Sequence, residues 1–150
     1  YAAVRTIVDQ NTGTRVEYVA GTARMEVDVE DFDSPGAVEG IVVNRQFFDN
    51  NGVAIGPRNG TDFISLATAQ INFDTWTIQS SDATVVRTDA MGDTSSTLAG
   101  NWEGLFAGPN GEEIVGIVVV EGNEPIGIDP ATGDFVDVSV REVGGLATQR

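Results

Sequence analysis

Carboxylates are the only abundant side chains in this sequence that could carry acid–base or metal chemistry. The chain contains 23 Asp and Glu residues, all 8 of its basic residues are Arg, and His and Cys are absent. Without imidazoles and thiols there is no Ser-His-Asp or Cys-His nucleophile, and no His- or Cys-ligated zinc site. We therefore expect a protein that is not an enzyme, with no catalytic residues and no cofactor.

Paired acids are the remaining route to catalysis, because two carboxylates that flank a glycosidic bond can hydrolyse it. Glu112 and Glu113 are the adjacent pair in a segment that reads as the start of a strand. Neighbouring residues in a strand point to opposite faces, so these two carboxylates cannot act together. We interpret them as turn and surface residues.

The densest acidic cluster is the best candidate for a cation site. Hard oxygen ligands on a loop suit Ca²⁺, although the spacing here does not match an EF-hand loop, and the acids between 129 and 134 form a second, similar candidate. Ordinary solvated turns are the alternative interpretation at both places, and we favour it. The four candidate calcium ligands are Asp28, Glu30, Asp31 and Asp33.

The charge balance narrows the range of partners. A formal net charge of -15 repels phosphate backbones and anionic lipid surfaces, which argues against nucleic acid and membrane binding. The longest apolar run, Ile114 to Val120, is much shorter than the roughly 18 residues of a membrane-spanning helix. A saline or extracellular medium, or a cationic partner, fits this charge better.

Alternation and β-branched residues predict an all-β chain with few helices. The segments are separated by turn formers such as Gly, Pro and Asn, and closure would remove the exposed edges of Val-rich strands. We therefore predict that residues 1–150 form a single domain, a small closed antiparallel barrel of about eight strands, with a β-sandwich as the alternative. The expected strands are 2–9, 15–29, 38–48, 63–78, 83–88, 97–107, 112–121 and 134–149.

The phenylalanines are expected in the core or as plugs at the barrel ends, because large aromatic side chains are usually buried. They are Phe32, Phe47, Phe48, Phe63, Phe73, Phe106 and Phe135.

The segment from 104 to 116 reads as a hairpin, in which Pro109 presets φ for a turn and Asn110 or Gly111 takes the positive φ. It resembles the β-barrel domain of the transferrin-binding protein B superfamily, surface lipoproteins of Gram-negative bacteria that include factor H binding protein. The family pattern is roughly Gly-x-Phe-aromatic-Gly-Pro-x-Ala-x-Glu-apolar-Gly-Gly. The matching residues are Gly104, Phe106, Gly108, Pro109, Glu113 and Gly116.

The hairpin departs from the family pattern at three positions, where Ala107 replaces an aromatic residue, Gly111 replaces Ala and Val115 replaces the first of the paired glycines. The matched residues concern the fold and carry no ligand site. The lipidated cysteine of the family has no counterpart in these 150 residues.

The resemblance implies a location outside the cytoplasm, on the outer-membrane surface of a Gram-negative bacterium or in its secreted fraction. We expect a non-catalytic binding or assembly module with a protein partner, serving nutrient capture or surface structure. Two alternatives remain open. One is a lipocalin-like carrier that holds a small apolar ligand inside the barrel, and the other is a structural subunit that associates with copies of itself.

Overall fold

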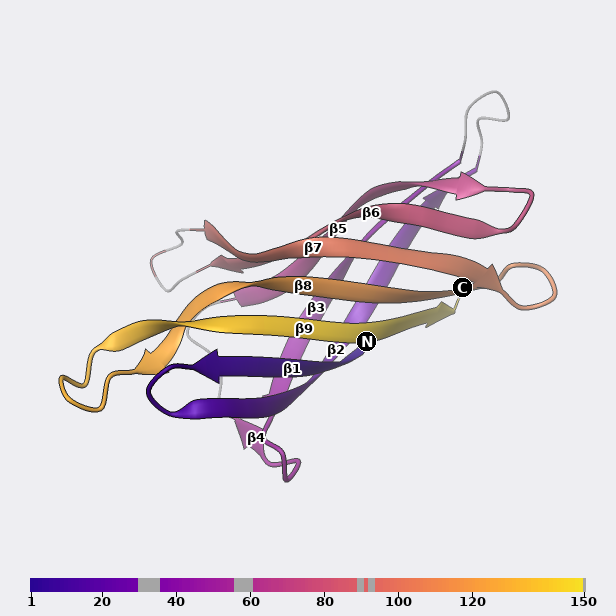
Figure 1. The fold of residues 1–150 in the computed structure, drawn as a ribbon. Coiled ribbons are helices and arrows are strands. Elements are labelled where there is room, and N and C mark those ends of the chain that lie inside the picture. Colours follow the sequence, from indigo (N-terminus) through magenta and orange to yellow (C-terminus); the bar gives the residue numbers. More distant parts are fainter. Residues whose placement is uncertain (30–35, 56–60, 89–90, 92–93, 150) are drawn as a thin grey trace.

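A computed structural model describes residues 1–29, 36–55, 61–88, 91 and 94–149, which Figure 1 shows as long strands wrapped around a common interior. In this part of the chain there are nine strands and no helix. The strands are β1 (Ala2–Asp9), β2 (Gly13–Asp28), β3 (Ala37–Phe48), β4 (Ala54–Ile55), β5 (Thr61–Asn72), β6 (Thr77–Thr88), β7 (Thr94–Ala107), β8 (Glu113–Ile128) and β9 (Phe135–Gln149).

The described strands close into a ring. Their order is β2-β1-β9-β8-β7-β6-β5-β3, and β2 also pairs with β3, so eight strands form a continuous antiparallel circuit with the short β4 beside β3. The predicted all-β fold with a small closed antiparallel barrel of about eight strands is confirmed. Closure leaves no free edge along the eight-strand circuit, which is the advantage that the Val-rich sequence predicts.

One expected strand, residues 63–78, is wrong because the chain turns within it. The side chain of Asn72 accepts hydrogen bonds from the backbone amides of Asp74 (3.0 Å) and Thr75 (3.3 Å). Trp76 then adopts a left-handed conformation with φ of 56°. This local turn outweighs the alternating pattern, so β5 ends at Asn72 and β6 runs from Thr77 through the segment predicted as a separate strand.

The expected turn after residue 121 is also wrong, because β8 continues to Ile128. Its Gly and Pro residues are absorbed by a shift of the β8–β9 register between Glu124 and Gly127. Gly and Pro in a strand often mark such irregularities instead of its end. The consequence is that Glu124 lies on the inner face of the barrel and is buried.

The apolar core fills much of the interior, and Trp102 on β7 is its largest side chain. Trp102 is 1% exposed, and its indole Nε1 donates to the carbonyl oxygen of Ala67 at 2.9 Å. Ala67 lies where the β3–β5 register shifts, between the pairs Val38–Ala69 and Gly40–Leu66. The indole therefore satisfies a carbonyl that the ladder leaves unpaired.

The hairpin that resembles the transferrin-binding protein B family joins β7 to β8. Gly104 faces Gly116 across the two strands, and a Cβ atom on Gly104 would lie 2.7 Å from the carbonyl oxygen of Val115. In the turn, Gly108 and Gly111 take positive φ values of 84° and 67°. The prediction gave the positive φ to Asn110 or Gly111, and Gly111 adopts it. The second positive φ in the turn belongs to Gly108, at the start of the turn.

The hairpin's other matched residues serve the fold. Phe106 packs half-buried against the core, and Pro109 is exposed in the turn. Gln149 of β9 donates to Glu113 at 3.4 Å.

The phenylalanines divide between the inside and the outside. Phe47 is buried, as predicted, whereas Phe73 and Phe135 are 43% and 73% exposed, so neither lies in the core, the first of the two places predicted for them. Phe73 lies in the turn after β5, where it contacts Trp76 edge to face, and Phe135 is the first residue of β9. Phe32 lies outside the described residues.

Candidate functional site

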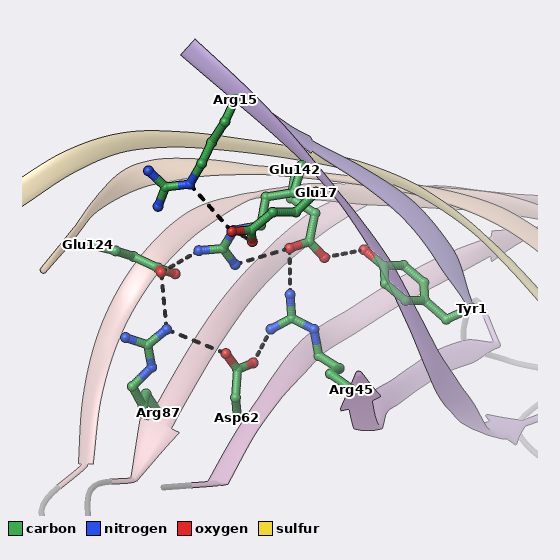
Figure 2. A network of polar contacts seen from close by, with 9 residues as sticks. Tyr1, Arg15, Glu17, Arg45, Asp62, Arg87, Glu124 and Glu142 are labelled. Carbon is green, nitrogen blue, oxygen red and sulfur yellow. Dashed lines mark hydrogen bonds and ion pairs between the residues drawn. The ribbon is translucent and has the colours of Figure 1, made fainter. Parts of the chain in front are cut away.

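The barrel interior holds a closed ring of ion pairs in which three arginines alternate with three acids (Figure 2). Each member comes from a different strand, so the ring links six of the eight strands. We call it the charge ring. In order around the circuit, its members are Arg5 (β1), Glu142 (β9), Arg45 (β3), Asp62 (β5), Arg87 (β6) and Glu124 (β8).

The contacts around the charge ring are close. Arg87 Nη2 lies 3.0 Å from Glu124 Oε2 and 3.6 Å from Asp62 Oδ2. Arg45 bridges Asp62 and Glu142. Arg5 bridges Glu124 and Glu142, with Nη1 3.5 Å from the Glu142 carboxylate. Each acid of the ring therefore contacts two guanidinium groups.

Two further groups extend the charge ring. Glu17 lies 3.8 Å from Arg5 Nε and 3.6 Å from Arg15 Nε, and the side chain of Arg15 is 40% exposed. Tyr1 donates its hydroxyl hydrogen to Glu142 Oε1 at 2.7 Å (Figure 2). The ring itself is neutral, and Arg15 balances the extra charge of Glu17. The net charge of -15 is therefore carried outside the ring.

Strand alternation explains how charges reach the interior. Arg5 shares the inner face of β1 with Ala3 and Ile7, whereas Val4 points outward and is 45% exposed. Two guanidinium groups lie over the ring of Phe47, that of Arg5 at 5.4 Å and that of Arg45 at 5.2 Å from the ring centre. Planar guanidinium groups stack well on aromatic rings, which helps them to leave water.

The environment fixes the protonation of two groups in the network. Burial would lower the pKa of Arg45, but the carboxylates of Glu142 and Asp62 outweigh it and raise that pKa, so Arg45 stays charged. Burial, together with the charge and hydrogen bond of Glu142, raises the pKa of Tyr1 far above its usual value. Neither group can exchange a proton near neutral pH, and the arrangement is suited to holding strands together.

Tyr1 makes the stability of the barrel depend on pH in the alkaline range. Because its folded pKa is raised, the unfolded chain loses the phenolic proton first, and the stability from Tyr1 is present below about pH 10 and lost as the pH rises above it. We expect Tyr1→Phe to lower the free energy of unfolding by about 1–2 kcal/mol at neutral pH. Above about pH 10, the free energy of unfolding of the variant should fall less steeply with pH than that of wild type. Urea unfolding across this range measures both effects.

Tyr18→Phe is the matched control, because this phenol lies on the outer face and is 45% exposed. It should leave the alkaline profile unchanged. Equal slopes for wild type and Tyr1→Phe would show that Tyr1 does not cause the alkaline sensitivity.

The outer face of several barrel strands carries a continuous stretch of apolar residues. A row of directly paired residues crosses five strands, and further apolar residues continue it on β8 and β7. Tyr18 and Val4 are each 45% exposed, and Ile117 is 44% exposed. We call this surface the apolar belt. It comprises Phe48, Tyr18, Val4, Val143, Val119, Ile117, Val115 and Leu105.

Of the four predicted calcium ligands, only one lies within the described residues. Asp28 ends β2 and is exposed, whereas Glu30, Asp31 and Asp33 lie outside the described residues. No group of three or more His, Cys, Asp or Glu residues in the described ranges is placed to hold a metal ion. In the second acidic segment, Asp129 accepts a hydrogen bond from the amide of Ala131 at 2.8 Å, as in an ordinary turn.

The adjacent glutamates Glu112 and Glu113 have separate structural contacts. Glu112 accepts a hydrogen bond from the amide of Asn110 at 2.8 Å and so stabilises the turn of the β7–β8 hairpin. Glu113 contacts Gln149 of β9. They do not converge on a shared partner in these contacts.

A groove of about 490 Å³ lies beside β2, β3 and β5. Its lining includes the exposed residues Arg24, Glu26, Glu39 and Thr68, and Thr68 donates to Glu39 at 2.7 Å. The β3–β5 register shifts next to this groove, between Val38 and Gly40.

The fold and these features define a closed antiparallel barrel with an internal charge ring and an external apolar belt. Comparisons with models of protein families, with curated proteins and with solved structures find no match. No helix in the described part of the chain is long and apolar enough to cross a membrane.

Proposed function

We propose that this chain is a non-catalytic binding or assembly module of a Gram-negative cell surface or secreted fraction, and that it contacts a protein partner through the apolar belt. The belt is the observation that carries the proposal. Large contiguous apolar patches are uncommon on soluble monomers and mark interaction sites. On a chain with 23 acidic residues, a face built of Val, Ile, Leu and Tyr is especially distinct.

The described interior argues for an outer contact face. Inward-facing positions are occupied by the apolar core around Trp102 and by the charge ring. A carrier of a small apolar ligand needs an open apolar cavity in the same space. The acids that could do chemistry inside the barrel are held by guanidinium groups, which supports a non-catalytic role.

The test compares Val4→Glu with wild type in affinity capture from the source cells and their medium. Val4 lies in the middle of the belt, so a charge there should abolish capture of the partner. Ser65→Glu is the control, because Ser65 is exposed on β5, away from the belt. A partner captured equally by wild type and Val4→Glu would exclude the belt as the site. A small apolar molecule extracted from the native protein would favour the carrier.

A further inference from the structure

We propose that the partner of the apolar belt is a second copy of this chain, related by a two-fold axis that runs parallel to the strands above the seam between β8 and β9. This inference rests on the proposed function and names the partner. Two-fold dimers are the commonest oligomers of soluble proteins, and they require a surface that is complementary to itself. The seam meets this requirement in both charge and size.

The register places four pairs of outward-facing residues across the seam. An axis along the seam exchanges β8 with β9, so each member of a pair in one copy comes to face the other member in the second copy. Figure 1 shows these two strands side by side in the wall of the barrel. The pairs are Glu121 with Arg141, Val119 with Val143, Ile117 with Gly145, and Val115 with Ala147.

Charge is complementary at one end of the seam. Arg141 and Glu121 form an ion pair at 3.7 Å within one chain, and their side chains are 62% and 69% exposed. In the dimer, Arg141 faces Glu121 of the second copy, so the one ion pair of each chain joins that of the other chain in a network of four alternating charges. Opposite charges brought together across an interface favour the correct register.

Size is complementary along the rest of the seam. Ile117 faces Gly145 of the second copy, and Val115 faces Ala147, so large side chains lie opposite small ones. A Cβ atom on Gly145 would have 3.9 Å to its nearest neighbour within the chain, which leaves the space above this glycine open for a partner. Glu103 on β7 pairs with Ile117, and Ala2 on β1 pairs with Gly145. In the dimer, Glu103 would therefore face Ala2 of the second copy and not another acid.

The overall charge gives the dimer a distinctive response to salt. Each copy carries a net charge of -15, so two copies repel one another. Salt shortens the range of this repulsion, from about 8 Å at physiological ionic strength to about 3 Å at 1 M. Self-association should therefore become stronger at high salt. Binding of a cationic partner to the same acidic protein would become weaker.

Sedimentation velocity across a range of protein concentrations, at about 0.15 M and about 1 M NaCl, tests the dimer. We expect a monomer–dimer equilibrium that tightens in the higher salt. Arg141→Glu and Glu121→Arg should each weaken self-association roughly tenfold or more, because like charges then meet across the axis. An equimolar mixture of the two variants should recover association as a heterodimer, and the double variant should recover the homodimer.

Ser65→Glu is again the control and should leave the equilibrium unchanged. Circular dichroism checks that each variant is folded, which is expected because the exchanged residues are exposed. A wild-type protein that remains monomeric at high concentration in both salts overturns the dimer. So does an association that neither single variant weakens.

The two proposals fail in different ways. If wild type is monomeric and a different protein is captured by wild type but not by Val4→Glu, the dimer is wrong and the belt remains a binding face. If Val4→Glu has no effect on any association, both proposals fall together.

Discussion

Arg45→Met is expected to lower the free energy of unfolding by about 3–5 kcal/mol, the usual cost of removing one partner from a buried ion pair. Arg45 joins Glu142 to Asp62 inside the charge ring, and its side chain is fully buried. Met fills part of the space but leaves a ring of two arginines and three acids. The cost arises mainly from carboxylates that stay buried with fewer counter-charges.

Urea unfolding of wild type and variant measures this effect, with Arg141→Met as the matched control. Arg141 also pairs with a glutamate, but both side chains are largely exposed, and such surface pairs contribute about 0–1 kcal/mol. Arg45→Lys keeps the charge but loses the fork that reaches two carboxylates, so an intermediate loss is expected. Similar losses for Arg45→Met and Arg141→Met would show that the charge ring does not stabilise the barrel.

Trp102→Ala should be similarly severe, at about 3–5 kcal/mol, as is typical when a large buried aromatic side chain is truncated. Trp102 is 1% exposed and is the largest fully buried side chain in the described core. Its loss would leave a cavity and also release the carbonyl of Ala67 at the register shift between β3 and β5.

Trp102→Phe separates these two contributions. It keeps an aromatic ring in the core but removes the hydrogen bond from the indole to the carbonyl of Ala67. Because Ala67 is exposed, water can replace this donor, and a loss of only about 0.5–1.5 kcal/mol is expected. Thermal and urea unfolding of both variants provide the comparison. If Trp102→Phe is as stable as wild type, the hydrogen bond to Ala67 contributes nothing, and the effect of Trp102→Ala is due to packing alone.

Local patterns predicted the strands well where each residue's partner lies nearby. β1 begins and ends where alternation places it, and the 104–116 segment forms the expected hairpin between β7 and β8. A glycine within a strand often marks a bulge, and Gly21 lies where the β2–β3 register shifts. The predictions failed where turn chemistry competed with alternation, at Asn72, and where Gly and Pro marked a bulge, after Glu124.

The charge ring could not be predicted because alternation defines two faces without saying which one is inside. On β1 the pattern places Arg5 and Ile7 on one face and Val4 and Val8 on the other, and apolar content alone favours neither. Arg5 pairs with Glu124 and Glu142, which lie 119 and 137 positions further along the chain. Only these distant contacts show that its face is the inner one. A usable signal is a charged residue that alternation places on one strand face with apolar residues, as with Arg5 between Ala3 and Ile7.

The same ambiguity hid the apolar belt. The pattern places Val16, Tyr18 and Ala20 on one face of β2, and the natural expectation for such a face is burial. The structure turns that face outward and places Glu17 and Val19 inside. The belt is therefore the counterpart of the buried charges, because Arg5 and Glu17 point inward and leave Val4 and Tyr18 on the outside.

The charge ring also constrains the order in which the barrel can form. Arg5, near the start of this sequence, depends on carboxylates on β8 and β9, and β1 itself pairs with β9. Contacts between such distant residues carry a large loop-closure entropy, and chains dominated by them fold slowly. During synthesis, the buried arginines have no complete set of counter-charges until β9 has been made. The eight-strand circuit should therefore close cooperatively, and only after β9 has been made.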